Sequence, residues 1–119
     1  MATLTPTLTL VSTDLSSDSL SITATDSLTV TQPNISTAKI SVSHSSKTNI
    51  LENNATTTYV YVKNTDSSNH VKLFNDSDQE WGIIWPGEFA FFGVTDNLGF
   101  RMQANNAACV VEYAYFTKG

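Results

Sequence analysis

The sequence predicts a single all-β domain, and three observations support this prediction. Short runs of β-branched and aromatic residues recur in the second half of the chain, at 59–63, 88–92 and 109–116. Turn-forming residues separate these runs, and no longer stretch has the helical periodicity of about 3.6 residues. A chain of 119 residues is also long enough to bury a hydrophobic core as one domain.

Seven strands are expected in the C-terminal part of the chain, at 35–44, 58–64, 70–75, 81–85, 88–94, 99–103 and 108–117. Pro86 and Gly87 predict a type II turn, because proline fixes φ at the first corner and glycine accepts a positive φ at the second. Segment 45–54 is considered for one helical turn. Closely spaced strands with polar turns favour an antiparallel β-sandwich or jelly-roll-like single domain.

The N-terminal part of the chain differs in composition from the rest. Serine and threonine fill 22 of the first 50 positions, whereas all twelve aromatic residues lie between Tyr59 and Phe116. Because aromatic side chains bury the most area per residue, the main core is expected in the C-terminal part. The predicted organisation is an extended Ser/Thr-rich N-terminal arm or strand-exchange segment at 1–34, followed by the β-sandwich domain at 35–119.

Apolar residues recur at every second position within this hydroxyl-rich segment, as in Leu8 and Leu10 or Leu20 and Ile22. Such alternation favours strands over disordered chain. Two similar stretches, 18–23 and 26–31, each begin with Asp-Ser and continue with alternating apolar residues. They predict a meander or hairpin, with Asp18 and Asp26 as turn formers.

The charge composition bears on the partners. The formal net charge is −5, with only six Lys and Arg residues in the chain. Nucleic-acid binding requires clustered cations, so no nucleic-acid partner is expected. No apolar run approaches the ~20 residues of a membrane span, and the start of the chain does not resemble a signal peptide. We therefore expect no membrane partner and synthesis in a cytoplasm, with a low-charge surface suited to packing against other protein.

The sequence offers little support for catalysis or for a cofactor. His44 and His70 are the only histidines, there is no Gly-x-Ser-x-Gly motif, and Cys109 lies within an apolar strand as an expected buried, inert thiol. No zinc-ligand spacing occurs, and the acidic segment 76–80 is interpreted as a solvated turn rather than a calcium loop. We predict no catalytic residue, no cofactor and no metal.

The aromatic residues of segment 81–92 have two interpretations. Trp81 and Trp85 near the predicted turn could form a platform for sugar rings, or the whole set could serve core and interface packing, which we favour. Phe91 and Phe92 are strand neighbours, so they must face opposite sides of the sheet. The candidate interface residues are apolar side chains from both parts of the chain: Leu8, Leu10, Leu20, Ile22, Trp81, Trp85 and Phe92.

Segments 59–66, 81–92 and 107–116 together resemble small structural virion proteins of tailed bacteriophages, particularly those of marine hosts such as cyanobacteria. The resemblance covers roughly residues 55–117. It implies a non-enzymatic particle protein located in the virion, whose partners are the major capsid protein or other virion proteins. The first hypothesis is a capsid decoration (cement) protein forming a homo-oligomer such as a trimer. The alternatives are a carbohydrate-binding module on a tail or fibre and an adaptor at the head–tail neck.

Overall fold

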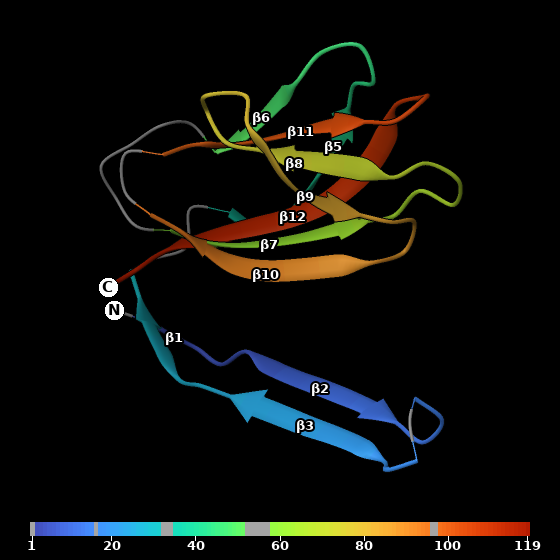
Figure 1. Ribbon diagram of the computed structural model, residues 1–119. Coiled ribbons are helices and arrows are strands. Elements are labelled where there is room, and N and C mark those ends of the chain that lie inside the picture. The colour runs from blue at the N-terminus through green and yellow to red at the C-terminus, as the bar shows by residue number, and fades with distance from the viewer. Residues whose placement is uncertain (1, 16, 32–34, 52–57, 96–97) are drawn as a thin grey trace.

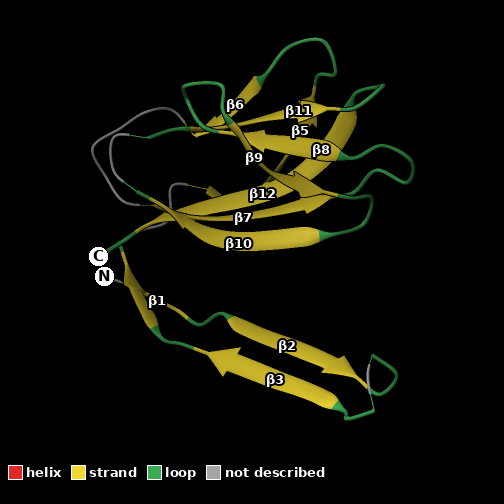
Figure 2. Cartoon of the chain, viewed as in Figure 1, coloured by secondary structure: helices red, strands yellow, loops and turns green. Residues whose placement is uncertain are grey.

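The computed structural model describes residues 2–15, 17–31, 35–51, 58–95 and 98–119. In these residues the chain is all-β and every strand pairing is antiparallel, which confirms the predicted class (Figures 1 and 2). The strands are β1 (Ala2–Leu4), β2 (Thr7–Ser12), β3 (Leu20–Thr25), β4 (Leu28–Val30), β5 (Ile35–Val42), β6 (Thr48–Leu51), β7 (Thr58–Asn64), β8 (Val71–Phe74), β9 (Glu80–Ile84), β10 (Phe89–Val94), β11 (Phe100–Ala104) and β12 (Cys109–Thr117).

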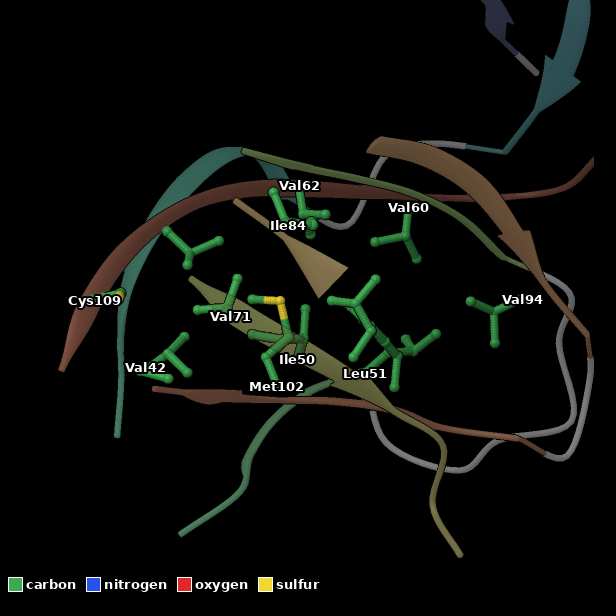
Figure 3. Packing of buried hydrophobic residues seen from close by; sticks show 14 residues of the cluster. Val42, Ile50, Leu51, Val60, Val62, Val71, Ile84, Val94, Met102 and Cys109 are labelled. Carbon is green, nitrogen blue, oxygen red and sulfur yellow. The ribbon is translucent and has the colours of Figure 1, made fainter. Parts of the chain in front are cut away.

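Two four-stranded sheets form the body of the molecule. Sheet 1 has the strand order β10-β7-β12-β5, and sheet 2 has the order β6-β11-β8-β9. The buried apolar side chains of both sheets meet in the layer between them (Figure 3). Strand β7 shows why: its residues alternate strictly between buried and partly exposed, so Val60 and Val62 enter the core while Tyr59 and Tyr61 face outward.

A separate N-terminal hairpin is formed by the first four strands. Strand β1 pairs with β4 and β2 pairs with β3, so one side of the hairpin is β1–β2 and the other is β3–β4. The cross-strand register passes unshifted over the interruption between Leu4 and Thr7, where Asp26 donates a backbone hydrogen bond of 3.3 Å to the Pro6 carbonyl. Figure 1 shows this hairpin running beside β10, attached to the body at the end where the chain termini lie.

All seven strands predicted for the C-terminal part are present, with ends displaced by at most two residues. The helical turn considered for 45–54 is wrong over Thr48–Leu51, which forms β6 and pairs with β11; residues 52–54 lie outside the described residues. Ile50 and Leu51 both belong to the buried core, so packing with residues distant in the sequence determines the structure of this segment. For the N-terminal segment the sequence predicts a meander or hairpin: a hairpin is present, with β2 paired to β3, but the meander is wrong. The two similar stretches follow one another along one side of the hairpin and do not pair with each other.

The turn between β9 and β10 has the predicted type II geometry. Gly87 has a φ of 80°, and the Glu88 backbone N–H donates a hydrogen bond of 3.0 Å to the Trp85 carbonyl. The Glu88 carboxylate in turn accepts a hydrogen bond of 3.2 Å from the Trp85 backbone N–H. This turn carries the chain from the edge of sheet 2 to the edge of sheet 1.

Candidate interaction surfaces

The distal part of the N-terminal hairpin has one apolar face. Leu8 lies opposite Ala24 and Leu10 lies opposite Ile22, and directly opposed residues in antiparallel strands project to the same side. Leu8, Leu10 and Ile22 are 44%, 45% and 46% exposed, and Leu20 continues the same face at the far end. The opposite face carries the threonine pairs of the two strands. Four predicted interface residues therefore share one face.

The base of the hairpin is fixed to the body. Val30 is 2% exposed and forms a bridge with Lys118. Thr31 donates a backbone hydrogen bond of 2.9 Å to the Thr117 carbonyl, and Gly119 donates one of 2.8 Å to the Thr29 carbonyl. The apolar alternation is thus buried at the base of the hairpin and exposed along its distal part.

The outer face of sheet 1 is aromatic where strand β10 forms its edge. Phe89 is 62% exposed, and Phe91 stacks on Tyr59 with ring centroids 6.1 Å apart. Phe92 points the other way and packs against the core, as the alternation of a strand predicts. Phe89 and Phe91 belong to this outer surface but are absent from the predicted interface residues. The sequence did contain a signal for them: they are two residues apart in a strand, so they share a face, and that face is opposite to the one that carries Phe92.

A charged row crosses the same outer face. Glu112 on β12 lies opposite Lys39 on β5 and opposite Lys63 on β7. The Tyr61 hydroxyl donates a hydrogen bond of 3.2 Å to the Glu112 carboxylate. Burial, followed by the negative charge of Glu112, raises the pKa of Tyr61 above its ordinary value. The phenol therefore remains protonated and serves as a donor.

A cleft of about 650 Å³ separates the hairpin from strand β10. We call it the hairpin cleft. Its residues come from both walls: Pro6, Thr7, Leu8, Ala24, Thr25 and Asp26 on the hairpin, and Phe89, Ala90 and Phe91 on β10. Leu10 and Ile22 are not among these residues, so only the Leu8–Ala24 pair of the apolar hairpin face lines the cleft.

Trp81 on β9 lines a second pocket, together with residues from the end of β10 and the start of β11. Its ring meets Phe92 edge to face at 5.1 Å, and Phe92 meets Phe100 in the same manner at 5.2 Å. The resulting pocket of about 390 Å³ is also lined by Asn75 and Leu98. Trp81 is half exposed at its mouth.

Trp85 belongs to a different cluster. Its ring lies 4.9 Å from the His70 ring, at the end of β9 opposite to Trp81, and it too is half exposed. The structure therefore does not bring Trp81 and Trp85 together as one platform. Ile83, between them on the edge strand β9, is also exposed.

Of the polar groups that could suggest chemistry, the buried Nε2 of His70 has no hydrogen-bond partner among the described residues, whereas the acidic segment and Cys109 have structural explanations. Arg101 donates a hydrogen bond of 2.8 Å to Asp78, and Lys72 lies 3.5 Å from Glu80, so the acidic segment is held by ion pairs. The Cys109 thiol is fully buried, and its burial raises its pKa, which disfavours the reactive thiolate.

No group of three or more metal-ligating side chains occurs in the described part of the chain. Nor do its described segments contain a helix that is long and apolar enough to cross a membrane. No protein-family model, curated protein sequence or solved structure matches this chain.

Proposed function

We propose that this protein is a non-enzymatic structural subunit of a bacteriophage virion, and specifically a capsid decoration (cement) protein that binds the shell and stabilises contacts between capsomers. The observation that carries the proposal is the exposed apolar face of the N-terminal hairpin, formed by Leu8, Leu10 and Ile22. Contiguous exposed apolar surface is a feature of proteins that bind other proteins. The resemblance of segments 59–66, 81–92 and 107–116 to phage virion proteins is the reason for proposing a bacteriophage particle as the assembly.

In this proposal the body is a β-sandwich of jelly-roll-like type, and the hairpin within residues 1–34 is an assembly arm. A cement protein needs a contact to the shell, and an oligomeric one needs a second contact to neighbouring subunits. The edge strand β9 provides a candidate shell contact, since Trp81 and Ile83 are exposed along it and Trp85 is exposed directly after it. An edge strand also offers unpaired backbone groups to which another chain can add.

The test of the proposal is the location and copy number of the protein in purified particles. A decoration protein is expected on the head at a copy number on the order of hundreds, following the symmetry of the shell, whereas a neck adaptor forms a ring of about six or twelve. Immunogold labelling and quantitative mass spectrometry of particles measure both. Absence from particles would refute the proposal, and a ring-like copy number would favour the head–tail adaptor.

The shell contact is tested by Ile83→Asp, which places a charge on the exposed edge of β9 without touching the core. Val110→Asp is the matched control, because Val110 is similarly exposed but lies on sheet 1. We expect only the first variant to lose co-sedimentation with shells. Equal binding of shells by both variants would show that β9 is not part of the shell contact.

A second candidate function is carbohydrate binding by a tail or fibre module. The pocket beneath Trp81, with Phe92 and Asn75 in its lining, favours it, because aromatic rings stack on sugars while amides bind their hydroxyls. Glycan-array binding that is lost in Trp81→Ala and kept in Trp85→Ala would support this candidate over the first.

A further inference from the structure

The apolar face of the hairpin is only partly covered in the single chain. Val30 is buried at its base, whereas Leu10 and Ile22 are nearly half exposed and are not among the residues that line the hairpin cleft. An isolated two-stranded hairpin is at best marginally stable in water. Covering this face requires an additional surface.

The edge of sheet 1 is equally uncovered. Strand β10 is the last strand of its sheet, and its sequence Phe-Ala-Phe-Phe-Gly-Val has no charged residue and no proline. Such groups are the usual protection of an edge strand against pairing with another chain. The exposed rings of Phe89 and Phe91 stand beside this edge and line the hairpin cleft.

The charges of the two surfaces are complementary. Residues 1–38 contain three aspartates, Asp14, Asp18 and Asp26, and neither lysine nor arginine. The outer face of sheet 1 carries Lys39 and Lys63 on either side of a single glutamate. A hairpin from another copy would therefore bring negative charge toward Lys63, which lies opposite Phe89 in the pairing of β10 with β7.

The connection between the base of the hairpin (β1 and β4) and its distal part (β2 and β3) allows the distal part to change direction relative to the base. The ladder is interrupted on both strands at the same level, at Thr5-Pro6 and Asp26-Ser27, although the register continues. Pro6 has no backbone N–H to donate to a ladder. One hydrogen bond of 3.3 Å spans the interruption, so the distal hairpin can turn here without disturbing the anchored base.

We propose that the protein self-associates by exchanging hairpins, so that the distal hairpin (β2 and β3) of one copy lies on Phe89 and Phe91 of a second copy. The occupant of the hairpin cleft is then the same segment of another chain. Exchange of an identical element between copies is a low-cost route to oligomers, because both surfaces are already present in each chain. Reciprocal exchange closes as a dimer, and exchange around a ring closes as a trimer.

The first test is the mass of the purified full-length chain, without particles, by light scattering and native mass spectrometry. We expect an oligomer at about 100 µM, and Leu10→Asp with Ile22→Asp should raise its dissociation constant roughly a hundredfold or more. Thr9→Asp with Thr23→Asp is the matched control: it adds the same charges to the neighbouring cross-strand pair on the opposite face, and should leave the oligomer intact. A monomeric wild type, or equal loss in both variants, overturns the proposal.

The second test places the contact. In a Cys109→Ser background, a Leu10→Cys chain is mixed with a Phe89→Cys chain and oxidised. Exchange predicts a disulfide-linked heterodimer of the two variants. A double Leu10→Cys, Phe89→Cys chain that instead forms only an internal disulfide would show that the hairpin closes on its own sheet, and would overturn the proposal.

These experiments do not depend on the proposed virion function. An oligomer cross-linked as described, from a protein absent from particles, would refute the virion proposal and leave hairpin exchange standing. A monomer that nevertheless decorates shells would refute hairpin exchange and leave the virion proposal standing.

Discussion

The side chain of Asn64, on β7 of sheet 1, donates a hydrogen bond of 3.2 Å to the backbone carbonyl of Ile84, on β9 of sheet 2. The same amide donates a bond of 2.9 Å to the Asn69 carbonyl, and its oxygen accepts one of 3.0 Å from the Asp66 N–H. Asn64 is completely buried. One satisfied polar side chain therefore joins the two sheets and the loop that follows β7.

Replacing Asn64 with alanine should lower the free energy of unfolding by about 3 kcal/mol, because buried backbone groups lose their partners. Denaturant unfolding measures the loss. Asn75→Ala is the control, since Asn75 makes a comparable set of hydrogen bonds to Ser77 and Gln79 in an exposed turn, where water can replace them. We expect that variant to lose less than about 1 kcal/mol. Equal losses would mean that burial does not determine the contribution.

Gly87→Val should lower the free energy of unfolding by more than about 1 kcal/mol, because a β-branched residue is strained at a φ of 80°. No atom lies within 4 Å of an added Cβ, so the loss would come from backbone conformation alone. Gly87→Asn provides the comparison, since asparagine tolerates this region better. Thermal melts that rank valine and asparagine equally would contradict this explanation.

The stability of the protein should fall in acid partly through Asp66. Hydrogen bonds from the backbone N–H groups of Asn69 and then Ser68 lower the pKa of this carboxyl below its ordinary value of 3.8. A lowered pKa in the folded state stabilises the protein above pH 3.8, and this contribution is lost as the pH falls through the folded value. Asp66→Asn should therefore flatten the decrease in unfolding free energy below about pH 4, measured by urea titrations. If the unfolding free energy of the variant decreased with pH as steeply as that of the wild type, the decrease would come from other carboxyl groups.

Removing the distal hairpin should spare the body. A chain in which an Asn-Gly turn joins Leu4 directly to Leu28 keeps β1, β4 and the contact of Val30, and should unfold within about 1 kcal/mol of the full chain. A chain beginning at Ile35 loses the burial of Val30 and should be less stable by about 2 kcal/mol. Calorimetry compares the two. A large loss in the first chain would show that the distal hairpin belongs to the core.

Local sequence was sufficient for the class and for most strands. The alternation in 58–64 predicted the strand, and the structure shows it as alternating buried and partly exposed residues, because successive strand side chains point to opposite faces. The Pro86-Gly87 turn was predictable for a similar reason, since the two residues restrict the backbone themselves. The alternating leucines of 8–10 and 20–22 likewise predicted strands with one apolar face.

Only the tertiary structure decided which surfaces meet. Segment 48–51 has no strong pattern of its own and becomes a strand because β11 offers it an edge and a core to fill. Trp81 and Trp85 have the same local signal, yet a bulge in the β8–β9 pairing turns Trp81 toward Phe92 while Trp85 reaches His70. The outward position of Phe89 and Phe91 also depends on the register between β10 and β7. Pairing and packing act between residues far apart in the chain, and periodicity along the chain does not encode which partner each residue finds.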